Sequence, residues 1–78
     1  MANDNLQLVI GKRQILRELK KNNIAEIMIA SDAEQQYIYS LIDAATEYDV
    51  KYSISGTMES YAAQYNVDVP TGAIGILK

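Results

Sequence analysis

Cysteine and histidine are both absent from this 78-residue sequence, and proline occurs only once. Without cysteine the chain forms no disulfide and offers no thiolate to a metal ion, which fits a reducing compartment. Without histidine it lacks the commonest general base and metal ligand, and the usual nucleophilic dyads are excluded. No pair of carboxylates stands out as a catalytic dyad. We therefore expect a protein that is not an enzyme, with no metal, no cofactor and no small-molecule substrate.

Long apolar runs are also lacking. The longest, at residues 27–30, is far shorter than the ~20 residues that a membrane-spanning helix needs. The first five residues contain neither the basic nor the apolar segment of a signal peptide. We expect a soluble cytoplasmic protein with no membrane contact. Because the chain is short and 49% hydrophobic, we expect one small domain over residues 1–78.

Positive charge is scarce, and it is unevenly distributed. The net charge of −3 argues by itself against a nucleic-acid-binding protein. Residues 1–21, however, carry five cations against two acids, whereas residues 22–78 carry two cations against eight acids. The Debye length is ~8 Å at physiological salt, so distant acids are screened and the basic end can meet a polyanion. A solvated helix face that happens to be basic explains the cluster equally well. Its members are Lys12, Arg13, Arg17, Lys20 and Lys21.

Apolar spacing predicts three helices. The first extends over residues 12–21 and ends at Asn22-Asn23, where asparagine tolerates the left-handed conformation. The second begins at a capping box formed by Ser31 and Glu34 and runs to about residue 48. The third begins after an N-cap at Thr57 and ends at Asn66. Three tyrosines on or near the second helix are expected to be packing residues: Tyr37, Tyr39 and Tyr48.

Four strands are predicted between these helices. They occupy residues 6–10, 24–30, 50–54 and 73–77, of which the second is expected to be buried on both faces and the third to have one wetter face. Strands that alternate with helices predict a sheet with helices on both faces. The expected fold class is therefore α/β, a three-layer α-β-α sandwich with a mixed four-stranded sheet.

Four segments, in order between residues 8 and 77, resemble a known family. Residues 9–14, Val-Ile-Gly-Lys-Arg-Gln, precede a helix with Arg17 and resemble the Gly-x-Lys-Gln start of that family's small bacterial members. Residues 27–33 resemble its buried strand followed by Ala-x-Asp, and the strand at Tyr52 leads to Asn-Val-Asp-Val-Pro at 66–70, which resembles its closing pattern. The family is the kink-turn RNA-binding ribosomal proteins of the archaeal "seven-Ae" and eukaryotic "thirty-e" type, and the sequence is most similar to its bacterial seven-Ae-like members.

The resemblance implies binding to a kink-turn, an RNA helix bent sharply at an internal loop with tandem sheared G·A pairs. It implies that Gly11 lets the backbone approach the groove closely, and that Arg13 and Gln14 contact guanine edges. The residues implied to contact phosphates are Lys12, Arg17 and Lys20. The loop implied to pack against an extruded nucleotide consists of Val67, Asp68, Val69, Pro70 and Thr71.

Two hypotheses of function follow. The first is a monomeric, non-enzymatic protein that recognises and stabilises kink-turn RNA, including ribosomal RNA, as a ribosomal or ribosome-associated component. The second is a protein-interaction or structural subunit with the same fold and weak or lost RNA binding. It is motivated by the acidic remainder of the chain and by the uncharged residues 56–58, where the family commonly has a lysine.

Overall fold

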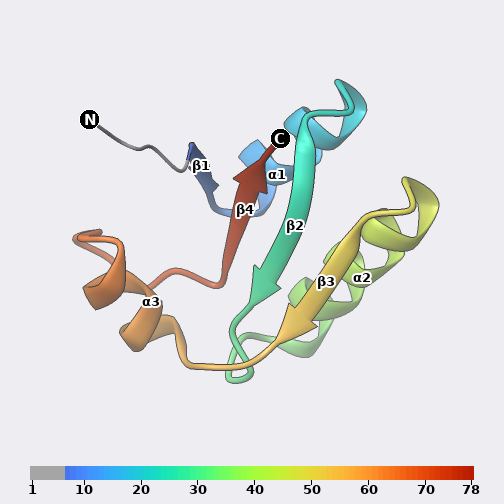
Figure 1. Cartoon of the computed structure of the whole chain (residues 1–78). Helices are drawn as coiled ribbons and strands as arrows, with labels where there is room; N and C mark the ends of the chain where they lie inside the picture. The colour runs from blue at the N-terminus through green and yellow to red at the C-terminus, as the bar shows by residue number, and fades with distance from the viewer. Residues whose placement is uncertain (1–6) are drawn as a thin grey trace.

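The computed structural model describes residues 7–78, in which strands and helices alternate as predicted (Figure 1). Leu6, the predicted first residue of the first strand, lies outside the described residues. None of the helices within residues 7–78 combines the length and apolarity required to cross a bilayer. The elements are β1 (Leu8–Ile10), α1 (Lys12–Lys20), β2 (Ile24–Ile29), α2 (Gln35–Glu47), β3 (Lys51–Ile54), α3 (Met58–Gln64) and β4 (Ala73–Leu77).

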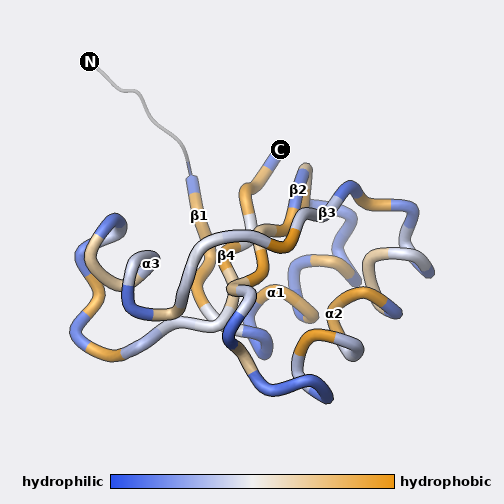
Figure 2. Tube along the Cα trace, turned by 90° about the horizontal axis from the view of Figure 1, so that it is seen from below, coloured by the Kyte–Doolittle hydropathy of each residue, from blue (hydrophilic) through white to orange (hydrophobic). Residues whose placement is uncertain are grey.

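The four strands form one mixed sheet in the order β1-β4-β2-β3. The central strand β4 is antiparallel to both of its neighbours, whereas β2 and β3 are parallel and connected through α2. Figure 2 shows α1 and α2 side by side on one side of the strands, with α3 set apart from them. The predicted α-β-α sandwich with a mixed four-stranded sheet is confirmed.

Two hydrophobic clusters fill the space between the sheet and the helices on its two faces. The smaller one joins Tyr61 of α3 to Ala30 and to Ile74 of β4. The larger one lies between the sheet and the pair α1 and α2, and each of its large side chains contributes roughly 1.5–3 kcal/mol by leaving water. The predicted apolar faces of the first two helices are confirmed by this cluster. Its buried members are Ile15, Leu19, Ile24, Ile27, Ile29, Leu41, Ala45 and Ala73.

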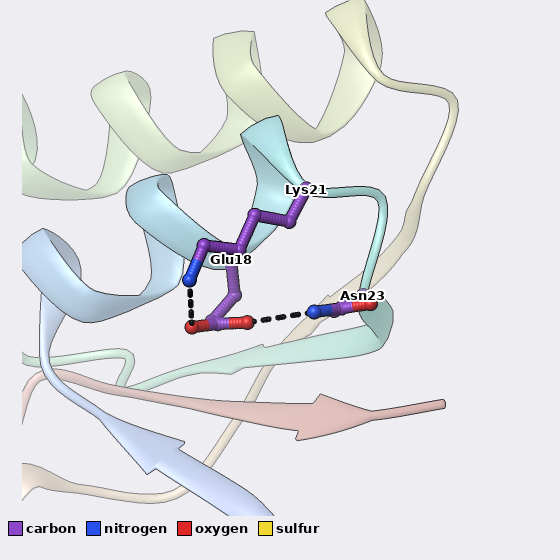
Figure 3. A network of polar contacts seen from close by, with 3 residues as sticks. All are labelled: Glu18, Lys21 and Asn23. Atoms are coloured by element: carbon purple, nitrogen blue, oxygen red, sulfur yellow. Dashed lines mark hydrogen bonds and ion pairs between the residues drawn. The ribbon is translucent and has the colours of Figure 1, made fainter.

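The end of α1 forms as predicted. Asn22 has a φ of 60°, the left-handed conformation expected there. The Glu18 carboxylate accepts a hydrogen bond from Asn23 Nδ2 at 3.0 Å and pairs with Lys21 Nζ at 3.7 Å (Figure 3). The Asn23 hydrogen bond is the largest influence on this carboxyl. Together with Lys21 and Arg17 it outweighs partial desolvation and lowers the pKa of Glu18 from its ordinary value.

The predicted capping box at the start of α2 is wrong. The helix begins at Gln35 with Glu34 as N-cap, and no side chain caps it. Instead, the Ser31 hydroxyl donates to the Gly56 carbonyl at 2.7 Å, and the Ser31 backbone N–H donates to the same oxygen at 2.9 Å. A partner 25 residues away thus takes the hydroxyl that local spacing assigned to the helix.

The predicted cap of α3 is confirmed. Thr57 is the N-cap, its hydroxyl accepts from the Ser60 N–H at 3.0 Å, and Ser60 completes a capping box by accepting from the Thr57 N–H at 2.9 Å. Thr57 and Ser60 are only three residues apart, so local sequence is enough to predict a cap at this position.

Three expectations about burial are wrong in part. In β2, only the side facing α1 and α2 is fully buried, since Met28 on the opposite side is half-buried. Tyr52 and Ile54 are 40% and 44% exposed because β3 is an edge strand. Of the tyrosines expected to pack, Tyr37 does pack on the larger cluster, but Tyr39 on the outer face of α2 is 58% exposed. Tyr48, just beyond α2, is 38% exposed.

Candidate functional site

Gly11 sets the direction in which α1 begins. Its φ of 94° and ψ of 153° lie in a region that L side chains rarely adopt, although a β-carbon there would meet no atom within 4 Å. The Gly11 N–H donates to the Ala73 carbonyl at 3.1 Å, and its carbonyl accepts the first bond of the helix from Ile15 at 3.1 Å. Backbone conformation, rather than lack of space, therefore requires glycine at the junction of β1 and α1.

Three of the cations on α1 line up on its exposed side. Arg13, Arg17 and Lys20 are exposed and follow i, i+4, i+7 spacing, opposite the buried Ile15 and Leu19. We call these three residues the basic ridge. None of them forms an ion pair within the described part of the chain. The ridge therefore presents its positive charge to solvent, and exposed Gln14 lies next to Arg13 in sequence. Lys21 does not extend the ridge, because it forms an ion pair with Glu18.

Lys12 does not belong to the basic ridge. It is half-buried, and its Nζ lies 5.4 Å from the centroid of the Tyr37 ring, a distance typical of a cation–π contact. Its backbone N–H donates to the Tyr37 hydroxyl at 3.1 Å. Burial raises the pKa of Tyr37 from its ordinary value, and the Lys12 hydrogen bond opposes this only in part. The hydroxyl therefore remains protonated at neutral pH.

A cleft of about 530 Å³ opens beside the start of α1. Its walls come from the end of β1, the segment that begins α2, the first residue of α3 and the loop before β4, and most of them are apolar. Such a volume and lining suit a flat, mostly uncharged group with a few polar atoms. The lining includes five residues predicted for the site: Gly11, Val67, Val69, Pro70 and Thr71.

The loop at residues 67–71 presents its side chains unequally. Val69 is 62% exposed at the rim of the cleft, and Pro70 is exposed beside it. Thr71 is only 4% exposed, and its N–H donates to the Met58 carbonyl at 3.3 Å, which fixes the base of the loop to the start of α3. Asp68 is exposed but does not line the cleft.

Six lining residues were not predicted as site residues. They come together because β2 and β4 pair antiparallel with Ile29 opposite Ala73, so the segment after β2 lies against the segment before β4. No local pattern in the sequence signals that pairing. The glycine next to β4 was the one available hint, since a close approach often requires glycine. The six are Ile10, Ala33, Glu34, Tyr37, Met58 and Gly72.

The fold places the chain in a known class of protein. No protein-family model matches the sequence. Among solved structures, the Giardia lamblia 15.5kD RNA binding protein superposes with a TM-score of 0.83 at 25% identity, over 91% of this chain. This chain spans 60% of the Giardia chain. A protein of unknown function from Bacillus halodurans shares the fold, with a TM-score of 0.82 at 18% identity over 92% of this chain and 72% of that one. The class is the α-β-α sandwich of the seven-Ae-like proteins.

Sequence comparison identifies the family within this class. The RNA-binding protein of Geobacillus thermodenitrificans is 31% identical over 72 residues, which cover 92% of this chain and 88% of that protein. The RNA-binding protein YbxF of Geobacillus stearothermophilus is 29% identical over 72 residues, which again cover 92% of this chain and 88% of that protein. The chain belongs to the family of these YbxF-like bacterial proteins. The family resemblance seen in the sequence is therefore confirmed as far as membership of this bacterial family.

Proposed function

We propose that this protein binds RNA through the start of α1 and the cleft beside it, and that its target is a kink-turn. The observation that carries the proposal is the exposed basic ridge, which begins two residues after Gly11, a residue that lines a mostly apolar cleft of about 530 Å³. Relatives named RNA-binding protein support the coarser part of it. The family resemblance supports the kink-turn and a ribosomal RNA as target.

The basic ridge and its neighbours on α1 would make two kinds of contact. Arg13 and Gln14, at the tip of the helix, present a guanidinium and an amide that match the N7 and O6 acceptors of guanine in sheared G·A pairs. Arg17 and Lys20 lie further along the same exposed side and would meet phosphates. Lys12, whose ammonium lies over Tyr37, would meet a phosphate from the cleft side.

The cleft would receive a nucleotide extruded from the loop of the kink-turn. Val67, Val69 and Pro70 offer apolar surface to either face of a base, and proline limits the freedom that the loop loses on binding. The Glu34 carboxylate is the acidic group in the lining and would accept from an amino or imino N–H of the base. Asp68, outside the lining, would stay in solvent.

Such binding would act on RNA shape without catalysing a reaction. A kink-turn interconverts between extended and bent forms, and a protein that binds only the bent form shifts the population towards it. The eight acids in residues 22–78 would repel RNA from the rest of the surface, so that productive contact is confined to the start of α1.

The exposed apolar side chains along β3 and α2 favour one alternative, a subunit that binds another protein and has lost RNA affinity. Tyr39, Tyr52 and Ile54 are all at least 40% exposed. This alternative predicts no RNA binding at moderate salt and retained binding of a protein partner.

The direct test is a fluorescence titration of the full chain with a kink-turn hairpin, at two salt concentrations. The control is the same hairpin with its tandem G·A pairs replaced by Watson–Crick pairs. We expect tighter binding to the kink-turn and a loss of affinity with salt. Equal affinity for both hairpins would defeat kink-turn recognition, and no binding to either would favour the interaction subunit.

A further inference from the structure

Tyr37 of α2 contacts both of the segments that the proposed function places against RNA. It bonds to the first residue of α1 and lies against Gly72 at the end of the 67–71 loop. We infer that Tyr37 is a positioning residue, which holds the tip of α1 and the loop in the arrangement that RNA binds. The inference rests on the proposed function, because it concerns the residue that holds the proposed RNA site in shape.

The contact with α1 replaces a missing cap. The first N–H groups of a helix have no acceptor within the helix, and a side chain at the N-cap usually supplies one. Here the N-cap is Gly11, which has no side chain and makes no such bond. The Tyr37 hydroxyl accepts from the Lys12 N–H at 3.1 Å instead, across 25 residues of sequence. Capping of the RNA-facing helix tip is thus supplied in part by another helix.

The contact with the loop is a close packing of ring against backbone. A β-carbon placed on Gly72 would lie 2.6 Å from Tyr37 Cε1 and 2.8 Å from Cζ. No side chain fits between them, so the ring edge supports the main chain where the loop enters β4. A shift of the ring would therefore move the wall of the cleft and the helix tip together.

The ring also bears on Lys12. The ammonium lies 5.4 Å from the ring centroid, which keeps this cation on the cleft side of α1 and away from the basic ridge. Tyr37 is half-buried and its ring lines the cleft, whereas its hydroxyl accepts from Lys12. The hydroxyl therefore orients the tip of α1, whatever contact the ring makes with a bound base.

The variant Tyr37→Phe tests the inference, since it removes the hydroxyl and keeps the ring. We expect it to weaken kink-turn binding about 3- to 10-fold, the effect of losing roughly one hydrogen bond. The slope of log affinity against log salt should stay unchanged, because no phosphate contact is removed. The Lys12 amide should also exchange its hydrogen faster, as measured by NMR without RNA. The matched control is Tyr39→Phe, on the exposed side of the same helix, which should change none of these values.

The outcomes separate the inference from the proposed function. All titrations are run at a temperature where circular dichroism shows every variant folded. If Tyr37→Phe binds the kink-turn as tightly as the unmodified chain, or more tightly, the positioning role is overturned while RNA binding stands. Unchanged hydrogen exchange of the Lys12 amide in Tyr37→Phe would also overturn it, because the hydroxyl would then not cap the start of α1. If the unmodified chain binds no kink-turn, the proposed function and this inference fail together.

Discussion

The carboxylate of Asp32 accepts a hydrogen bond from the Met58 backbone N–H at 2.9 Å. Asp32 follows β2, whereas Met58 is the first residue of α3, so the bond joins two segments that are 26 residues apart. Ala33, the next residue, and Met58 itself both line the cleft. This one contact therefore caps α3 from outside and fixes one side of the candidate site.

Removal of that carboxylate should destabilise the protein. We expect Asp32→Ala to lower the free energy of unfolding by about 0.5–2 kcal/mol, the usual cost of losing a helix cap. Asp32→Asn keeps a side-chain acceptor and should recover most of the loss. Urea denaturation followed by circular dichroism measures both. Equal losses in the two variants would contradict a capping role.

Gly72 and Tyr37 should behave as a coupled pair. Gly72→Ala puts a β-carbon 2.6 Å from the Tyr37 ring, and overpacking of this kind costs about 1–3 kcal/mol. In a Tyr37→Ala background the ring is gone, so the same glycine substitution should cost much less. A double-mutant cycle of unfolding free energies measures the difference. Additive costs would show that the two residues do not press on each other.

Glu18 should make stability depend on pH in the acid range. The pKa of Glu18 is lower in the folded protein than its ordinary value of 4.5. The ionised carboxylate therefore stabilises the folded state at pH values above that ordinary pKa. That contribution is lost as the pH falls through the folded-state pKa, when the group becomes protonated. Urea midpoints at neutral pH and about one unit below the ordinary glutamate pKa should therefore differ less in Glu18→Gln than in the unmodified chain.

Asn23→Ala provides the second variant for that measurement. The hydrogen bond from Asn23 is the largest cause of the lowered pKa, so its removal should reduce the same acid-range loss. If stability falls by the same amount at acid pH in the unmodified chain and in both variants, other carboxylates cause the effect.

Much of the fold was predictable because the interactions that define it are local or periodic. The helix end at Asn22 and the N-cap at Thr57 depend on residues within a few positions of each other. The strand at Ala73–Leu77 and the apolar faces of α1 and α2 follow from the two periods of secondary structure. The same patterns gave the order of strands and helices along the chain, and the structure has that order.

The errors have one physical cause, namely partners that are distant in sequence. Ser31 bonds to Gly56 rather than to its own helix, so the predicted capping box does not form. Lys12 lies over Tyr37, which no spacing rule signals. The cleft forms because the end of β2 meets the start of β4. Exposure of Tyr52 could not be predicted, because alternation within a strand does not reveal whether the strand lies at an edge.

Substitutions at the start of α1 should separate base recognition from phosphate contact. Arg13→Ala and Gln14→Ala should each cost about 1–3 kcal/mol of affinity for a kink-turn hairpin and reduce the preference for G·A pairs. Arg17→Ala should weaken binding to both hairpins equally and lower the salt slope by about one phosphate contact. Fluorescence titrations of the three variants against both hairpins provide the comparison. A uniform effect of Arg13→Ala would contradict its assignment to guanine edges.

We propose that the chain stabilises the bent form of a kink-turn, and bending can be measured directly. A hairpin with a donor and an acceptor dye at the ends of its two arms reports bending by energy transfer, and the hairpin without G·A pairs is its control. We expect that adding the full chain raises energy transfer to a plateau in the kink-turn and leaves the control unchanged. Unchanged energy transfer in a kink-turn that the protein demonstrably binds, or an equal rise in the control, would contradict it.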